Sequence, residues 1–558
     1  MKATTVVCSC LLIVAALGSI AAVAQNPVPF QHIVLIVQEN RTPDNLFGAA
    51  PSWAHCGQAD PFETGVDIQD GGPDFSSGVS PAVTRCLVSQ RLGTCWDVVH
   101  SHTAWNNQAD IVVAGNAPQA RMDLACTNGL KAEADGCSLP QDCPEYSFVQ
   151  KSDVQPYFDI ATNYGFANYM FATNEGPSFP AHQFLLGGTS APTPPLDPNN
   201  YYQYFVSENG YTGCDGGGLN AQTDWTDFSG QDIAPIYDYK DCYDHPTLVD
   251  LLDYHTPNPI SWRYYAPTPG FIWTAVDAIK HLCYAVQNPP PGQPCDSADW
   301  LNMRFGHPDN AVPILTDIMT CQLQQMSWVI PDERWSDHAG NGFIPPSGFG
   351  GPSYVADIIN AIGNSPCTNA VGTNTYTYWQ DTAIFVVWDD WGGWYDHVPP
   401  PPGMILRQIN GTSDCTNING TWGCGYTYGF RVPLLVVSAY TKAGYVSGSI
   451  APGQPGEVYP YIHDFGSILR FIEKNFGLTY IVPTPSGQYA DYNAPDNGEV
   501  VPPHDGHVPL SDFFQWPYRS FVPVNPAAGM DADYFIHFFT RPENQGQNPV
   551  GPDGDDAE

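Results

Sequence analysis

The sequence predicts an α/β fold, in which a central, mainly parallel β-sheet is flanked by helices on both faces and carries long, disulfide-stapled loop insertions. Residues 32–37 (HIVLIV) and 383–388 (AIFVVW) are apolar runs without polar alternation, which is typical of parallel strands buried on both faces. Helix, strand and loop also recur in this order along the chain, which favours parallel α/β architecture.

The other elements follow from periodicity and from their flanking residues. Four further strands are expected at residues 168–173, 260–266, 326–331 and 432–438. Helices are expected at residues 157–167, 247–254, 275–282, 312–325, 354–362 and 464–476. Asp464 is a candidate N-cap of the last helix.

Length and charge limit the classes of function. The chain has 558 residues, enough for one large α/β domain with insertions. Its 19 basic and 57 acidic residues give a formal charge of −38, which argues against a nucleic-acid partner, because such binding depends on phosphate contacts from basic side chains. An anionic substrate would need local positive charge, from a metal or from imidazole.

The amino terminus predicts export. An apolar segment follows Lys2, and residues 22–24 (AVA) fit a small-x-small cleavage site. We therefore expect a signal peptide at 1–24, one large domain with loop insertions at 25–520, and a C-terminal extension with an acidic tail at 521–558. The protein is expected to be secreted or periplasmic, with no transmembrane segment in the mature chain.

The cysteines fit an oxidising compartment. Two of the 16 lie in the expected signal peptide, so 14 remain, enough for up to seven disulfides. Sequence does not fix their connectivity, although Cys137/Cys143 and Cys415/Cys424 are close enough in sequence to be plausible pairs.

Polar side chains follow two of the expected buried strands. Glu39 and Asn40 come just after the first, and Asp389 and Asp390 directly after the strand at 383–388. Ligands bind beyond the carboxyl ends of strands in such sheets, and clustered carboxylates repel one another unless a cation lies between them. The pattern favours a divalent metal site, although Asp and Asn are also ordinary turn and cap residues.

Further candidates lie in loops. Ser178 follows a Gly-Pro turn at an expected helix start, where free backbone N–H groups favour an anion. It is either an N-cap or, beside a metal, a nucleophile. His100 and His102 alternate in a D-x-x-H-x-H run and could face one way on an extended segment. Asp337 and His338 again follow an expected strand.

Several segments resemble, in order, the motifs of the bacterial phospholipase C and acid phosphatase phosphoesterase family, whose core is similar to the alkaline phosphatase superfamily. The matching segments include QENRTPDNLFG, DVVHSH, NEGPSFPAHQFLLGGTS, WVIPDERWSDH, TAIFVVWDDWGGWYDHV and HDFGSILRFIE. The resemblance runs from about residue 31 to 520. It implies an alkaline phosphatase-like core and a secreted hydrolase of phosphoric esters.

Carried over position by position, the resemblance implies a divalent metal held by Glu39, Asn40, Asp389 and Asp390, with Ser178 as the nucleophile. It also implies that His100, His102, His281 and His338 surround the phosphate, with His338 or His100 as the catalytic acid and base. His182 and Asp337 are expected as further substrate-binding residues. One departure concerns phosphate binding: the family commonly has Asn three residues after the nucleophile, where this chain has Ala181, with His182 next.

Three hypotheses of function follow. The first is a phosphodiesterase of phospholipase C type, which acts on phospholipids through transient contact with a membrane surface. The aromatic cluster of Trp388, Trp391, Trp394 and Tyr395 could hold a quaternary ammonium group, or it could simply pack the loop. The second is an acid phosphomonoesterase of broad substrate range. The third is a non-enzymatic, cation-binding secreted protein.

Overall fold

The computed structural model describes residues 30–551 except 49–64, 79–81, 115–116, 128, 133–136, 141, 191–203, 210–212, 215–221, 227–231, 238–241, 243, 287–292, 341–349, 402–407, 410–411, 414–426, 451–460, 483–488 and 494–507. The expected signal peptide, the Cys415/Cys424 pair and residues 552–558 of the acidic tail lie outside the described residues.

The central sheet confirms the predicted fold class. In spatial order its described strands are β16 (Met303–Phe305), β15 (Trp262–Ala266), β17 (Met326–Val329), β1 (His32–Gln38), β20 (Thr382–Trp388), β23 (Leu434–Ser438), β10 (Gly165–Ala167) and β24 (Tyr445–Ser447). Only β23 among them runs against its neighbours, β20 and β10. The sheet is therefore mainly parallel, with β1 and β20 at its centre.

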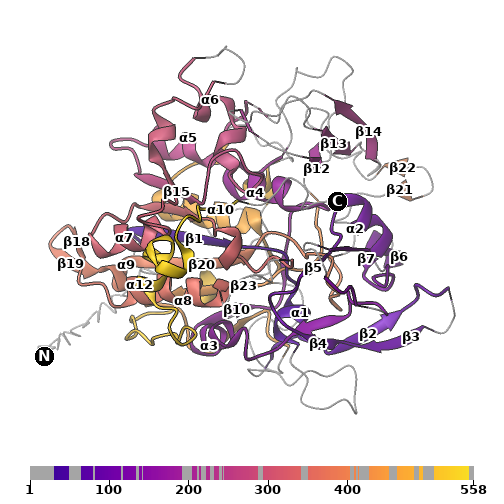
Figure 1. Cartoon of the computed structure of the whole chain (residues 1–558). Helices are drawn as coiled ribbons and strands as arrows, with labels where there is room; N and C mark the ends of the chain where they lie inside the picture. Colours follow the sequence, from indigo (N-terminus) through magenta and orange to yellow (C-terminus); the bar gives the residue numbers. More distant parts are fainter. Residues whose placement is uncertain are drawn as a thin grey trace, which may run out of the picture.

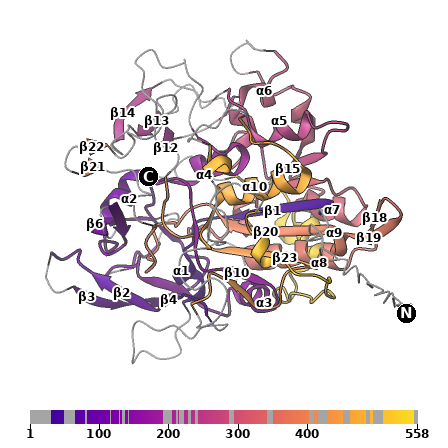
Figure 2. The ribbon, with the colours of Figure 1, turned by 180° about the vertical axis from the view of Figure 1, so that it is seen from behind.

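Helices cover both faces of this sheet (Figure 1). On one face lie α4 (Ser178–Gly187) and α10 (Phe465–Phe476), and on the other α3 (Gln155–Asn163) and α8 (Gly350–Gly363). The opposite view shows the same three layers, with α10 above β20 and α3 below β10 (Figure 2).

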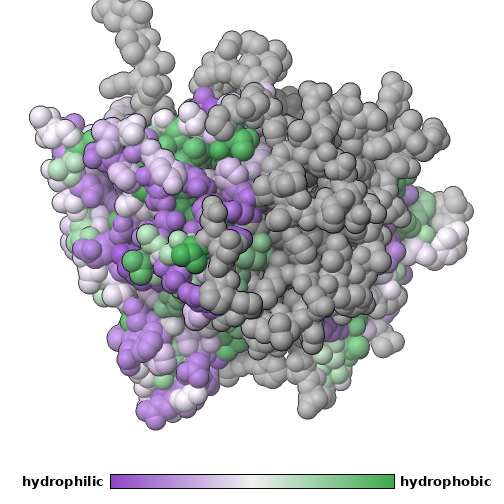
Figure 3. Space-filling view, turned by 90° about the horizontal axis from the view of Figure 1, so that it is seen from above, coloured by the Kyte–Doolittle hydropathy of each residue, from purple (hydrophilic) through white to green (hydrophobic). Residues whose placement is uncertain are grey.

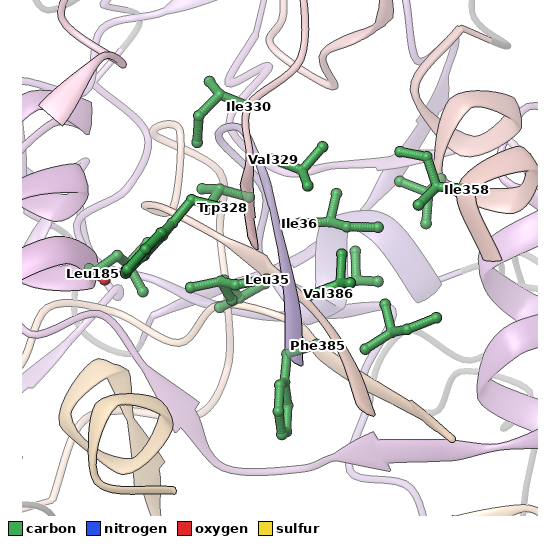
Figure 4. Close-up of a cluster of buried hydrophobic side chains, with 14 of the residues drawn as sticks. Leu35, Ile36, Leu185, Trp328, Val329, Ile330, Ile358, Phe385 and Val386 are labelled. Atoms are coloured by element: carbon green, nitrogen blue, oxygen red, sulfur yellow. Dashed lines mark hydrogen bonds between the residues drawn. The ribbon is translucent and has the colours of Figure 1, made fainter. Parts of the chain in front are cut away.

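The two layers of core side chains follow from the strand pleat, because successive residues of a strand point to opposite faces. In β1, Leu35 points toward the α4 layer, where Trp328 and Leu185 also lie, whereas Ile36 points toward Ile358 of α8 (Figure 4). All five side chains are buried. An apolar run without alternation is what burial on both faces requires.

Several elements differ from those predicted. The helix expected at 157–167 ends at Asn163, and Gly165–Ala167 is strand β10. The helix expected at 312–325 is α7 (Pro313–Met319), which stops before Cys321, a residue with positive φ that is disulfide-bonded to Cys367. The segment at 275–282 is a 3₁₀ turn, Ala275–Ala278, followed by the short helix α6 (Lys280–Cys283). Helix bounds predicted from local apolar periodicity cannot take such tertiary contacts into account.

The insertion between β1 and α3 gathers beside the carboxyl ends of the central strands, where β2 (Gly71–Asp74), β5 (Trp96–Val98) and α2 (His102–Gln108) lie (Figure 1). Disulfides staple it, as expected, but their connectivity differs from the suggested Cys137/Cys143 pair. Cys137 bonds Cys95, and Cys143 bonds Cys126. Further disulfides join Cys214 to Cys242 and Cys283 to Cys295.

One face of the molecule is mostly hydrophilic where the structure describes it (Figure 3). On the face above α5 (Leu248–Asp253) and α6, the described residues are mostly hydrophilic, with small apolar areas between them (Figure 3). Within the described residues, no helix combines the length and the hydropathy that a membrane span would need.

A buried ionic network joins α1 (Pro43–Phe47) to the loop after β20. Arg431 donates to Asp396 at 2.9 Å and to Asp44 at 3.1 Å, and His397 contacts Asp44 at 2.7 Å and Asp67 at 3.0 Å. Burial disfavours a charged His397 ring, but Asp44 and Asp67 outweigh it and raise the pKa to about 9. Burial likewise opposes ionisation of Asp67, but His397 and Arg431 lower its pKa to about 2.

The network predicts a pH dependence of stability. Because the folded pKa of His397 lies above its ordinary 6.5, its contribution is complete below pH 6.5 and is lost as the pH rises through 9. Asp67, with a lowered pKa, contributes above its ordinary 3.8 and loses this contribution as the pH falls toward 2. His397→Gln should lower the free energy of unfolding, and we expect this loss to be about 3 kcal/mol smaller at about pH 9.5 than at about pH 6.

The loss of unfolding free energy is measured at each pH by guanidinium unfolding without reductant, with tryptophan fluorescence as the signal. The exposed His307→Gln (its side chain is 69% exposed) is the control and should give a curve parallel to wild type. A constant difference between wild type and His397→Gln over this range would contradict the assignment.

Candidate active site

The ends of β1 and β20 bring the predicted carboxylates together. The two strands are parallel with Gln38 paired to Trp388, so Glu39 and Asp389 leave the sheet at the same level. Asp389 N–H donates to the carbonyl of Gln38 at 3.0 Å, which extends the ladder by one residue. Glu39, Asn40, Asp389 and Asp390 are all fully buried.

Backbone N–H groups fix one oxygen of each aspartate. Asp389 Oδ1 accepts from the N–H of Asn40 at 2.9 Å and of Asp390 at 2.7 Å. Asp390 Oδ1 accepts from Gly392 N–H at 2.6 Å. Gly392 has φ +60°, and a Cβ there would lie 2.3 Å from the carbonyl oxygen of Asn40, so only glycine allows this close turn. Each aspartate thus keeps its Oδ2 for other contacts.

Ser178 meets this cluster from a third part of the chain. It is the first residue of α4, after a turn in which Asn174 Nδ2 donates to the carbonyl of Gly176 at 2.9 Å. Ser178 Oγ lies 3.4 Å from Glu39 Oε2, 3.5 Å from Asn40 Oδ1 and 3.4 Å from Asp390 Oδ2. The serine and the metal-ligand candidates of the sequence analysis therefore form one buried cluster.

The electrostatics of this cluster favour a cation. Burial, together with the neighbouring charge of Asp389, raises the pKa of Asp390 well above its ordinary value. Asp389 Oδ2 is buried and, within the described part of the chain, accepts no hydrogen bond. Arg41, the next residue after Asn40, donates instead to the carbonyl of Asp337 and to Asn45.

The donor set also fits a divalent ion. Carboxylate and amide oxygens are ligands that Mg²⁺, Mn²⁺ and Zn²⁺ accept. Oxygen atoms 3.4 Å apart, as around Ser178 Oγ, are too far apart for strong hydrogen bonds, but this is about the separation of two ligands around one ion. The residues present therefore fit a metal.

Two histidines and Asp97 form a second buried group next to the first. His100 Nδ1 lies 2.7 Å from the carbonyl of Val98 and 3.4 Å from Asp97 Oδ2, and its Nε2 lies 3.1 Å from Asn40 Nδ2. Burial lowers the pKa of His100, but Asp97 and Asp390 outweigh it and raise the pKa to about 10. A cation bound by the same carboxylates would oppose this rise.

His338 completes the second group. Its Nδ1 lies 2.5 Å from the carbonyl of Ala339, and its Nε2 lies 4.0 Å from Asp97 Oδ2. That Nε2 atom is buried and makes no hydrogen bond to any residue that the structure describes. The carbonyl fixes the proton on Nδ1, so the neutral ring keeps a lone pair on Nε2. This is the form of a proton acceptor.

His102 and His182 also lie close to functional candidates. The D-x-x-H-x-H run is not one extended segment, because β5 ends at Val98 and His102 begins α2. His102 stacks on Trp105, and its Nε2 lies 3.9 Å from Glu175 Oε2. His182 Nε2 lies 3.2 Å from Glu39 Oε1, and burial lowers the pKa of this ring to about 4.

Two expected substrate contacts lie elsewhere. Asp337 points into the core, where its Oδ2 accepts from Tyr157 at 2.8 Å and from Trp388 at 3.0 Å. Burial raises its pKa to about 7. His281 is held by Asp244 at 2.8 Å and Asp250 at 3.2 Å, at the partly exposed end of α5. The structure therefore gives both side chains local partners and does not bring either of them to the cluster around Ser178.

The aromatic cluster after β20 packs the loop and is not open to a ligand. Trp388, Trp391, Trp394 and Tyr395 are at most 1% exposed. Trp391 Nε1 donates to Gln108 Oε1 at 2.7 Å, and the Arg41 guanidinium lies 5.1 Å above Trp394. The packing interpretation of these aromatics is therefore the one that the structure supports.

Sequence reasoning did not single out Asp97 as a site residue. Its carboxylate faces both His100 and His338. The available signal was its place in the D-x-x-H-x-H run, but the contact with His338 joins segments 241 positions apart in sequence (338 minus 97), and no local pattern reports it.

Comparisons with known proteins identify the family of the chain. The model of the Phosphoesterase family matches residues 30–479. The chain is 24% identical to a non-hemolytic phospholipase C of Burkholderia pseudomallei over 89% of its length and 64% of that protein. It is 22% identical to a non-hemolytic phospholipase C of Pseudomonas aeruginosa over 80% of its length and 54% of that protein.

A third relative, phospholipase C B of Mycobacterium tuberculosis, is 25% identical over 82% of this chain and 74% of that protein. The chain thus spans between about half and three quarters of the length of these relatives. The family match covers most of the chain and every residue of the two buried groups, and on this basis the chain belongs to the Phosphoesterase family.

Proposed function

We propose that this protein is a secreted, metal-dependent phosphoesterase of phospholipase C type, which hydrolyses phosphate esters through Ser178. The observation that carries the proposal is the convergence of Ser178 Oγ with Glu39, Asn40 and Asp390 at 3.4–3.5 Å. The family match and the phospholipases C among the relatives support the reaction class. The disulfides and the predicted signal peptide support export.

A divalent ion bound by Glu39, Asn40, Asp389 and Asp390 would lower the pKa of the Ser178 hydroxyl and neutralise charge on the phosphoryl oxygens. Ser178 Oγ passes its proton toward the carboxylate oxygens 3.4 Å away and attacks phosphorus. The new Oγ–P bond gives a phosphoserine, and the bond from phosphorus to the leaving oxygen breaks. For a phospholipid, the leaving group is a diacylglycerol.

A histidine supplies the proton that the leaving oxygen needs. His100, whose pKa is raised to about 10, protonates the leaving oxygen, or His338 does so after it has taken up a proton; the two ring centroids lie 5.5 Å apart. The same ring then takes a proton from the water that attacks the phosphoserine, and Ser178 is released with its own proton restored. Asp97 Oδ2 lies 3.4 Å from His100 Nδ1 and 4.0 Å from His338 Nε2, and its charge favours a protonated ring at both positions.

An acid phosphomonoesterase is the second candidate. The burial of Trp388, Trp391, Trp394 and Tyr395 favours it, because it removes the aromatic surface that would have recognised a choline head group.

The nucleophile assignment predicts the effect of two substitutions. Ser178→Ala and Asp390→Asn should each lower kcat by at least about 1,000-fold, because each removes a group that acts in the transition state. Ser353→Ala, at a buried serine on α8, is the control and should keep near-normal turnover. Acid quenching of the wild type during turnover, followed by peptide mass spectrometry, should find one phosphoryl group on Ser178. Turnover within tenfold of wild type in Ser178→Ala would refute the nucleophile.

Metal removal and a substrate panel test the reaction class. Chelator-treated protein should lose activity on both p-nitrophenyl phosphate and p-nitrophenylphosphorylcholine, and a divalent ion should restore it. Preference for the phosphorylcholine ester supports phospholipase C type, and preference for the monoester supports the phosphatase. Full activity after verified metal removal would contradict metal dependence, and inactivity on both substrates with metal restored would favour a cation-binding protein.

A further inference from the structure

The two oxygens of the Glu39 carboxylate face different side chains. Its Oε2 lies 3.4 Å from Ser178 Oγ, whereas its Oε1 lies 3.2 Å from His182 Nε2. Ser178 and His182 are four residues apart on α4, so they lie one above the other on the same helix face. The helix therefore presents a hydroxyl and an imidazole together to the ends of β1 and β20.

His182 Nε2 also faces a second carboxylate. It lies 3.9 Å from Asp389 Oδ2, which is too long for a hydrogen bond. This Asp389 oxygen is fully buried and has no hydrogen-bond donor among the described residues. A hydrogen bond from His182 to Glu39 would thus leave a buried carboxylate oxygen unsatisfied, which is costly.

A shared ion would satisfy all three groups. One ligand atom from each of Glu39, His182 and Asp389 can be chosen so that all lie within 4.8 Å of one another. Two ligands bound about 2.1 Å from one ion are about 3 to 4 Å apart, and the observed 3.2 Å and 3.9 Å fall in this range.

We propose that His182 Nε2 is a ligand of the metal ion, bound together with Glu39 and Asp389. This rests on the proposed metal-dependent function and adds the class of metal. Oxygen ligands alone suit Mg²⁺ and Ca²⁺, whereas an imidazole ligand shifts preference to borderline transition metals such as Zn²⁺, Co²⁺ and Mn²⁺. His182 is then a metal ligand rather than the substrate contact that the sequence suggested.

The test measures metal binding directly. Chelator-stripped wild type and His182→Gln are titrated with Co²⁺, followed by visible absorption, and with Mg²⁺ in competition. We expect His182→Gln to weaken Co²⁺ binding by about 100-fold and to change its absorption spectrum, with Mg²⁺ affinity changed less than about threefold. His245→Gln is the matched control, because this buried histidine packs on Gly187 at the other end of α4, and it should bind Co²⁺ like the wild type.

A second variant keeps the test decisive if His182→Gln folds poorly. In His182→Cys the thiolate should bind the ion and add a thiolate-to-cobalt charge-transfer band in the near ultraviolet, which a residue outside the coordination sphere would not give. Unchanged Co²⁺ affinity in His182→Gln, or no such band in folded His182→Cys, would overturn the proposal.

The experiment distinguishes failure of the His182 assignment from failure of the proposed metal-dependent function. If Asp390→Asn weakens Co²⁺ binding but neither His182 variant alters it, the metal site stands and only the role of His182 falls. If the wild type binds no divalent ion at all, the proposed function falls with it.

Discussion

The burial of three carboxylates at the ends of two adjacent parallel strands is the constraint on which the rest of this structure depends. Glu39, Asp389 and Asp390 are fully buried, and like charges so close together in a poorly hydrated interior repel one another strongly. The register that pairs Gln38 with Trp388 forces them together. Backbone N–H groups hold one oxygen of each aspartate, and the remaining oxygens define where positive charge must lie.

Hydrogen bonds beneath the site hold the ends of β1 and β20 in place. Gln38 accepts from the N–H of Asp337 at 2.9 Å and donates to the carbonyl of Trp335 at 3.2 Å. Asp337 in turn accepts from Tyr157 and Trp388. The loop that carries His338 is therefore anchored to β1 and to the carboxyl end of β20 through Asp337, the residue before it.

The core strands and the main cluster could be predicted because each depends on a local pattern with one physical cause. An unalternated apolar run means burial on both faces, and the residues after it must lie at the sheet edge. The pattern does not say which way a side chain turns once the strand has ended. Asp337 and His338 are adjacent, yet one points into the core and the other faces Asp97. The pairing of Cys95 with Cys137, and the capture of His281 by Asp244 and Asp250, depend on contacts between distant segments.

Two disulfides hold the segment that supplies Asp97 and His100, so the position of these two side chains depends on oxidised cysteines. Cys95, two residues before Asp97, is bonded to Cys137, and Cys126 is bonded to Cys143. The strand-end carboxylates and Ser178 belong to the sheet and to α4, which these two disulfides do not join. Reduction of these two bonds would therefore release the segment that carries Asp97 and His100, whereas Ser178 and His338 would keep their own contacts. The two disulfides thus couple the position of His100 to the redox state of its surroundings.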